Sequence, residues 1–195
     1  MFRKALDIKL EVLPNNHSEV MDLYMYLATS LKKQGKFPEA TKIHKLQLEP
    51  LVEMHGEDHP GVVLAYNGIA ALLALQNRLD DALQMLDKAI EICYRLPRLG
   101  DLDIGILGGT LLSKAKTLED QGNVEAVVET LNKVLTIQVE PVGEMNPRTV
   151  KTYEELALAY VRRGMTEGAI KAYTKAIKLV KKSLAMNIPT LKSLC

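Results

Sequence analysis

Apolar residues recur along the chain with the spacing of amphipathic helices, and short polar turns interrupt them at regular distances. Leu23, Leu27 and Leu31 lie four residues apart before the first turn, and Leu156 and Tyr160 repeat this spacing before the last one. Such spacing places side chains on one face of a helix. The pattern predicts no strands and nine helices. The predicted helices lie near residues 2–13, 18–34, 37–54, 61–76, 79–95, 104–121, 124–139, 148–163 and 166–185.

The turns recur at a nearly constant period. Turn residues of the glycine type stand at Gly35, Asn77, Gly122 and Gly164, with spacings of 42, 45 and 42 residues. A period in this range indicates a repeat architecture. Gly and Asn can adopt the left-handed conformation that ends a helix. Each turn is therefore predicted to join the two antiparallel helices of one repeat unit.

Small residues stand at fixed distances from these turns and support the same repeat. Alanine stands seven residues before each turn, at Ala28, Ala70, Ala115 and Ala157. Five residues after each turn stand Ala40, Ala82, Val127 and Ala169. Small side chains let two helices approach closely. A continuous coiled coil is the alternative, because 42 residues are six heptads, but Pro and Gly in every unit would interrupt it.

A polar residue just ahead of Ser or Pro marks the start of each unit, as is typical of helix N-termini. These starts are His17-Ser18, His59-Pro60, Asn146-Pro147 and, after Asn187, Pro189. We predict a single repeat domain over residues 1–195, with four full units. The units span residues 18–55, 60–96, 103–140 and 147–185. Residues 1–13 would be the second helix of a truncated unit and residues 187–195 the start of a further one, as if the chain were cut from a longer array.

Composition and charge narrow the classes of partner. Hydrophobic residues make up 47% of the chain and charged residues 25%, which is ordinary for a globular protein. A formal net charge of +1 argues against binding to the phosphate backbone of a nucleic acid. No apolar run reaches the roughly 18 residues that a membrane span requires. Two cysteines, Cys93 and Cys195, cannot form a disulfide framework, so we expect a cytoplasmic protein.

The sequence predicts no catalytic, cofactor or metal site. It contains no Gly-rich phosphate loop and no activated nucleophile. His55 and His59 stand four residues apart, but they fall in a loop that ends at Pro60, where helical spacing fails. Capping of the next helix is a better interpretation of this pair than metal binding. We therefore do not expect an enzyme.

The units resemble tetratricopeptide repeats, and their longer period resembles the 42-residue repeats of kinesin light chains. The resemblance rests on residues 56–60 (GEDHP), 65–70 (AYNGIA) and 79–82 (LDDA). It implies an all-α, right-handed superhelical solenoid of antiparallel helix pairs. It also implies a scaffold or adaptor for protein–protein interaction, associated with the cytoskeleton, whose first helices line a concave groove for a partner peptide or amphipathic helix.

The resemblance implies that the groove residues lie at matching positions on the first helix of each unit. The groove residues with a predicted role in partner binding are Met25, Asn67, Leu112, Lys116, Lys151 and Arg162. Two interpretations remain open. The apolar members could accept a partner helix, or Met25 and Leu112 could pack against the next unit and leave only polar residues exposed. The Lys/Asn clamp of chaperone-binding members is absent, which argues against a C-terminal carboxylate as the ligand.

Two further features could bind partners. Lys171, Lys175, Lys178 and Lys182 follow helical spacing on one face. This face is either solvated or covers an acidic neighbour in a longer array, or else it contacts an acidic partner or an anionic membrane surface. Both ends of the chain are apolar and lack the polar caps that solenoids need. The alternative function is therefore a structural assembly element that self-associates or stacks through its repeat ends and outer faces. The apolar end residues include Phe2, Leu6, Ile8, Leu10 and Leu13, the face of residues 170–184, and Ile188, Leu191 and Leu194.

Overall fold

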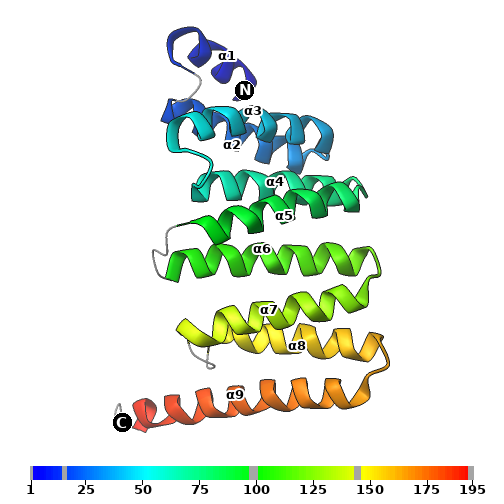
Figure 1. Ribbon diagram of the computed structural model, residues 1–195. Coiled ribbons are helices and arrows are strands. Elements are labelled where there is room, and N and C mark those ends of the chain that lie inside the picture. Colours follow the sequence, from blue (N-terminus) through cyan, green and yellow to red (C-terminus); the bar gives the residue numbers. More distant parts are fainter. Residues whose placement is uncertain (1, 15–16, 97–100, 143–145, 193–195) are drawn as a thin grey trace. The chain divides into compact units, whose positions relative to one another are not determined.

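The computed structural model describes residues 2–14, 17–96, 101–142 and 146–192, and the described residues form nine α-helices and no strand (Figure 1). The chain divides into two compact units, Met1–Leu99 and Gly100–Cys195. Unit 1 contains α1 to α5 and unit 2 contains α6 to α9. The helices are α1 (Phe2–Val12), α2 (Ser18–Lys33), α3 (Phe37–His55), α4 (Pro60–Leu75), α5 (Leu79–Arg95), α6 (Asp101–Asp120), α7 (Val124–Val142), α8 (Pro147–Arg162) and α9 (Thr166–Lys192).

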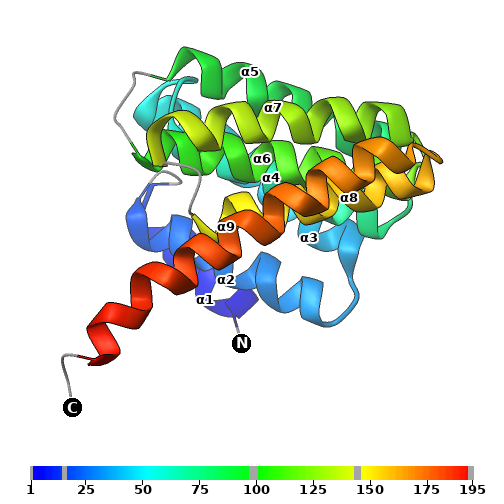
Figure 2. The ribbon, with the colours of Figure 1, turned by 90° about the horizontal axis from the view of Figure 1, so that it is seen from below.

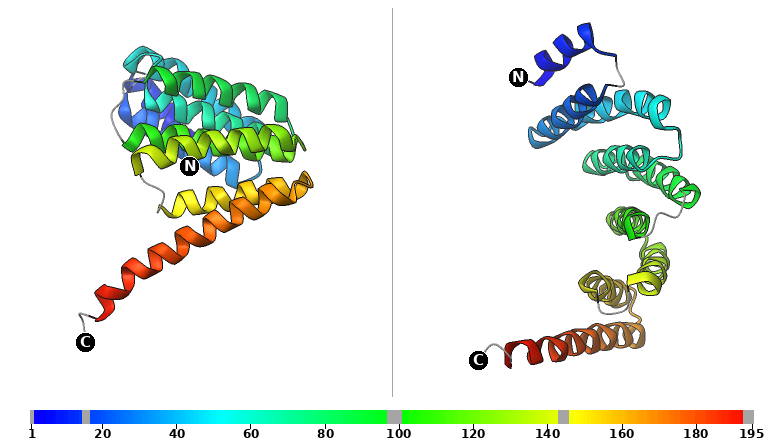
Figure 3. Two further views of the ribbon diagram at one scale, coloured as in Figure 1. Left: turned by 60° about the horizontal axis from the view of Figure 1, so that its bottom comes forward. Right: turned by 90° about the vertical axis from the view of Figure 1, so that its left-hand side faces the viewer.

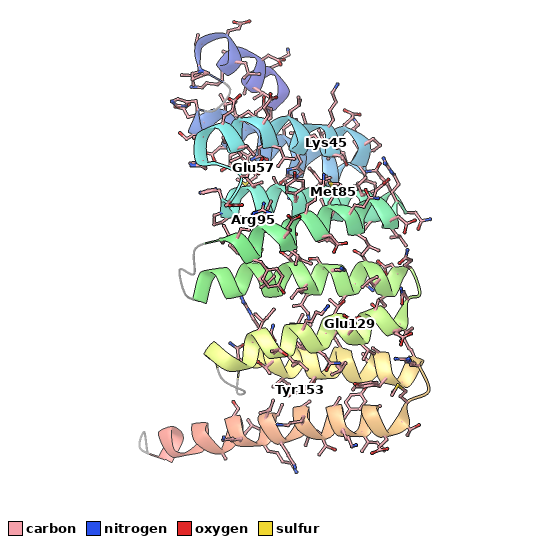
Figure 4. The ribbon with its side chains drawn as sticks, viewed as in Figure 1. Lys45, Glu57, Met85, Arg95, Glu129 and Tyr153 are labelled. Atoms are coloured by element: carbon pink, nitrogen blue, oxygen red, sulfur yellow. The ribbon has the colours of Figure 1, made fainter. Side chains whose placement is uncertain are left out.

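Within each unit, every helix packs against the next one along the chain. Figure 3 shows these consecutive helices side by side. In unit 1, α4 and α5 enclose a core of Ile69, Leu73 and Leu86, with Met85 at its edge (Figure 4). In unit 2, α7 packs against both α6 and α8, and α9 packs against α8. The buried faces are aliphatic, as expected for a chain that has no Trp and only two Phe.

The four predicted turns are confirmed by their backbone geometry. Gly35, Asn77, Gly122 and Gly164 all have positive φ, between 58° and 81°. At the last turn the N–H of Met165 donates to Tyr160 O (2.9 Å) and that of Gly164 donates to Val161 O (3.0 Å). The other three turns repeat both bonds. These are the two hydrogen bonds of a Schellman motif, which satisfy carbonyls that the helix end leaves unpaired.

The small positions are buried where helices pair, as predicted. The alanines seven residues before the turns are 0–4% exposed, and the residues five after them are 0–5% exposed. Three of the four predicted helix starts are also confirmed, because His17, His59 and Asn146 each accept a hydrogen bond from the backbone N–H two residues later. These caps satisfy one of the free donors at a helix N-terminus.

The loop between α3 and α4 is held to the far end of α5. Arg95 donates to Asp58 in this loop (2.8 Å) and to Glu91 one turn earlier on α5 (2.8 Å). Figure 4 shows Arg95 and the neighbouring loop residue Glu57. An exposed ion pair of this kind contributes little to stability on its own, and it links the α3–α4 loop to the C-terminal end of α5.

Two predictions differ from the structure. A new helix was predicted to begin near Pro189, but α9 continues to Lys192. The sequence between residues 183 and 188 contains no Gly or Pro that would end the helix. Leu6 was predicted to be an uncovered end residue, but it is buried against α2 at 5% exposure, while Ile8 on the same helix is 62% exposed. The side chains of Phe2, Ile188, Leu191 and Leu194 lie outside the described residues.

Candidate functional site

The candidate site is a cleft of about 470 Å³ in unit 2, between the first helices α6 and α8, with α7 beneath it. Two predicted groove residues, Leu112 and Lys151, line this cleft. Its remaining walls come from residues that the sequence did not single out for partner binding. The cleft is lined by Gly105, Gly108, Gly109, Leu112, Gln138, Asn146, Arg148, Lys151, Thr152 and Glu155.

The α6 wall is mostly backbone, because glycine occupies three neighbouring positions of one helical face. Gly105, Gly108 and Gly109 stand three and four residues apart, and Leu112 continues this face one turn later. A Cβ added at Gly109 would meet no atom within 4 Å. The glycines therefore leave open space beside α6 that larger side chains would fill, and Leu112 supplies an apolar patch next to it.

The floor of the cleft carries a buried polar pair. Thr152 is 1% exposed and Gln138 is 8% exposed. The Thr152 hydroxyl lies 3.1 Å from the Gln138 amide and 3.0 Å from the carbonyl of Arg148. The Gln138 Nε2 atom lies 3.9 Å from the position of a Cβ built on Gly108. One end of the Gln138 amide is thus fixed by Thr152, and the other end faces the glycine wall, where it can hydrogen-bond a ligand.

The α8 wall provides charge. Asn146 caps the helix by accepting from Arg148 N–H at 2.8 Å. Arg148, Lys151 and Glu155 then follow at intervals of three and four residues, so they share one face of α8. Lys151 is 3.9 Å from Glu155, and Arg148 extends towards Gly105 across the cleft. The rim therefore offers two cations and one carboxylate, which suit hydrogen bonds with the backbone and acidic groups of a bound segment.

Lys116 and Arg162, also predicted for the groove, meet at one carboxylate instead of lining the cleft. Lys116 on α6 binds Glu119 (2.7 Å) and Asp120 (3.2 Å), and Arg162 on α8 binds the same Glu119. This network ties the ends of α6 and α8 that are near their turns. Both side chains are more than half exposed, so the network remains accessible.

The predicted groove residues of unit 1 are Met25 on α2 and Asn67 on α4. Met25 is 46% exposed, so it does not pack away from solvent as one interpretation required. Asn67 is half-buried. Its neighbour Gly68 lies against the His44 ring, whose Nε2 atom is 3.0 Å from the position of an added Cβ. Burial lowers the pKa of His44 below its usual range.

The predicted basic face lies on α9. Lys171 is paired with Glu167 at 2.6 Å, and Lys175, Lys178 and Lys182 are exposed. The His55 and His59 rings stack at 4.2 Å, and Nδ1 of His59 accepts from Gly61 N–H, which confirms the capping interpretation for His59. Within the described part of the chain, no group of three or more potential metal ligands is found. No described helix is long and apolar enough to cross a membrane.

Among the site residues that were not predicted, Gln138 could have been recognised from its position in the repeat. It stands sixteen residues after its turn, where the other units have Leu51, Cys93 and Val180. A polar residue at an otherwise apolar register position is costly to bury unless it is hydrogen-bonded. Arg148 could also have been found, because it shares a helical face with Lys151 and Glu155.

Comparison with known proteins agrees with this geometry. Models of the tetratricopeptide repeat match residues 19–95 and 150–181, which together are more than half of the chain. No curated protein matches the sequence significantly.

Three solved structures show the fold. A Podosopora anserina protein with nearly identical TPR-like repeats of the kinesin light chain type is 18% identical, with a TM-score of 0.75 over 93% of this chain and 85% of that one. BtubC (BKLC) from P. vanneervenii is 19% identical, with a TM-score of 0.75 over 95% and 72%. Aspartyl phosphate phosphatase F from Bacillus subtilis is 14% identical, with a TM-score of 0.75 over 93% of this chain but 45% of that one. The chain belongs to the tetratricopeptide repeat family.

Proposed function

We propose that this protein is an adaptor that binds a peptide or helix of a partner protein along its first helices, with the cleft between α6 and α8 as the principal contact. Tetratricopeptide repeats present extended surfaces for protein–protein interaction. The observation that carries the proposal is the cleft itself, since it lies between two first helices, where the family resemblance places the groove.

The lining of the cleft supports a peptide as the ligand. A partner side chain can pack on Leu112 and the glycine face, while its backbone can bond the Nε2 end of the Gln138 amide. Arg148 and Lys151 can bind acidic groups of the same segment. Binding sites of this kind combine apolar surface with a few well-placed polar groups. The cytoplasmic location stays a prediction that rests on the two cysteines, and the cytoskeletal association stays a prediction that rests on the resemblance to kinesin light chain repeats.

Selection from a random peptide library on the purified chain tests the proposal. The enriched peptides would be labelled and titrated against the wild type and the double variant Arg148→Glu, Lys151→Glu. Loss of two charge-assisted contacts should weaken binding at least about tenfold, since each contributes roughly 1.5–3 kcal/mol. The control carries Lys33→Glu and Lys45→Glu, which change the net charge equally on exposed positions of unit 1. Equal affinity for both double variants, or no enriched peptide, would contradict the proposal.

The self-associating assembly element stays the second prediction. The exposed Ile8 (62%) and Val12 (72%) on α1 favour it, because both are large apolar side chains at one end of unit 1. Sedimentation of the wild type and of an Ile8→Glu, Val12→Glu variant over a range of concentrations tests it. A concentration-dependent mass that the variant loses is the expected result, and a monomer at every concentration would exclude it.

A further inference from the structure

The outer side of α9 carries an exposed apolar stripe with the spacing of a helix-packing seam. We call it the α9 face and define it by Ile170, Tyr173, Ile177, Val180 and Leu184. Their exposed fractions are 60, 37, 53, 43 and 59%. Intervals of three and four residues place all five on one side of the helix. Seen from below, α9 is the nearest element of unit 2 and no described helix of that unit covers its outer side (Figure 2).

The repeat itself shows what this face is shaped to contact. The same register positions on α7 are Val128, Leu131, Leu135 and Gln138, which are 8, 2, 8 and 8% exposed. They are covered because α8 packs against α7. In unit 1, Thr41 and Leu51 hold equivalent positions on α3, packed by α4, and both are 8% exposed. On α7, and at these two positions of α3, the register is buried where the next helix of the unit packs, so a helix is a complementary shape.

A shallow groove beside the stripe could receive side chains of such a helix. It measures about 270 Å³ and runs between α8 and α9. Tyr173, Ile177 and Val180 form its apolar side, and Glu154 and Lys181 stand at its edge. Tyr153 lies on α8, the other helix of this pair (Figure 4). Side chains of one helix that enter spaces on another are the usual basis of helix packing.

The charge around the stripe indicates which kind of partner helix can bind there. Lys171, Lys178 and Lys181 each follow a stripe residue directly in the sequence. Glu167, which pairs with Lys171, is the only carboxylate in residues 166–192 of the sequence, and Glu154 of α8 stands at the edge of the groove, so lysines outnumber carboxylates around the stripe. Two copies that met through this face would bring lysines against lysines, and like charges at such a contact oppose association. A helix with Asp or Glu beside its apolar seam would instead meet complementary charge.

We propose that the α9 face binds an amphipathic helix of a partner protein, whose apolar seam covers Ile170, Tyr173, Ile177, Val180 and Leu184 and whose flanking Asp and Glu residues pair with the lysines. This contact is separate from the cleft between α6 and α8 and does not depend on it. Burial of the stripe supplies the affinity, and the lysines supply selectivity and salt dependence.

Three designed peptide helices of equal length serve as probes. The first has a leucine seam flanked by Glu, the second has the same seam flanked by Lys, and the third keeps the Glu residues but has Ser in the seam. Each would be labelled and titrated against the full chain by fluorescence anisotropy at low and high salt. The first probe should bind at least about tenfold more tightly than either of the others, and its affinity should fall as salt rises.

Two variants locate the binding. Ile170→Ser with Ile177→Ser should weaken the first probe at least tenfold, and Lys178→Glu with Lys181→Glu should reverse the preference between the first and second probes. The matched control is Leu75→Ser with Tyr94→Ser, which removes two similarly exposed apolar side chains of unit 1 and should leave binding unchanged. All these side chains are exposed, and circular dichroism would verify that each variant is folded.

Three results would overturn the proposal. The first is equal affinity for the Glu-flanked and Lys-flanked probes. The second is equal loss of binding in the control and the Ile170→Ser, Ile177→Ser variant. The third is a dimer of the chain alone that disappears in the Ile170→Ser, Ile177→Ser variant but persists in the control, since a second copy would then cover the face.

Discussion

Replacement of glycine by alanine should have opposite effects at two positions of unit 2. Gly164 ends α8 with a φ of 74°, and Gly109 lies inside α6 with an ordinary helical backbone. At both positions an added Cβ would meet no atom within 4 Å, so steric contact with neighbours does not enter the comparison. The outcome therefore depends on backbone conformation alone.

The magnitudes follow from the two conformations. Alanine in the left-handed region costs about 1–2 kcal/mol, so Gly164→Ala should lower the free energy of unfolding by that amount. Alanine inside a helix is favoured over glycine by about 0.5–1 kcal/mol, so Gly109→Ala should raise it. The free energies of unfolding of the two variants should thus differ by about 1.5–3 kcal/mol, although the chemical change is the same.

Urea unfolding followed by circular dichroism measures this difference. The slope of the free energy with urea should stay the same in both variants, because each exposes the same surface on unfolding, and only the midpoints should move in opposite directions. A Gly164→Ala variant as stable as the wild type would refute the claim that the turn requires a left-handed residue. A destabilised Gly109→Ala variant would show that the space beside α6 is not open.

The remaining predictions concern packing, an unpaired hydroxyl and pH. Ala70→Leu and Ala157→Leu should each lower the free energy of unfolding by about 1–3 kcal/mol through overpacking, since both alanines are at most 1% exposed, and unchanged melting temperatures would exclude the close helix contact. Thr149→Val should stabilise the chain by about 1 kcal/mol, because the Thr149 hydroxyl is buried and has no partner among the described atoms, whereas Thr152→Val should destabilise it. Burial lowers the pKa of His44, and burial followed by the neighbouring His55 lowers that of His59, so the unfolded state binds protons first as pH falls. Stability should therefore be full above about pH 6.5 and decrease as pH falls below it, and a His44→Gln variant should show a shallower decrease in urea midpoint than the wild type.

Most of the fold could be predicted because it depends on local chemistry that every unit repeats. Gly35 and its three counterparts end their helices through hydrogen bonds within five residues of sequence. His17, His59 and Asn146 cap helices through bonds to a residue only two positions away. The extension of α9 past Asn187 was not predicted. Asn187 ahead of Pro189 indicated the start of a new helix, but no Gly or Pro between residues 183 and 188 ends α9 before that point.

The site was predicted less completely because its parts come from three helices. Leu112 and Lys151 could be placed by register, and the structure brings both to the cleft. The pairing of Arg162 with Glu119 depends on how α8 stands relative to α6, which no spacing within either helix reveals. The opening of the cleft also depends on three glycines of α6. The space that they leave becomes a cleft only because α8 lies opposite them.

One register position shows how a repeat of uniform fold can acquire different surfaces. Sixteen residues after each turn the chain has Leu51, Cys93, Gln138 and Val180. Leu51 and Cys93 are buried apolar residues, whereas Gln138 is buried but polar and forms the floor of the cleft. Val180 is 43% exposed and belongs to the α9 face. The side chain and the presence of a following helix therefore determine whether it serves as core, as a polar contact in the groove, or as a surface for a partner helix.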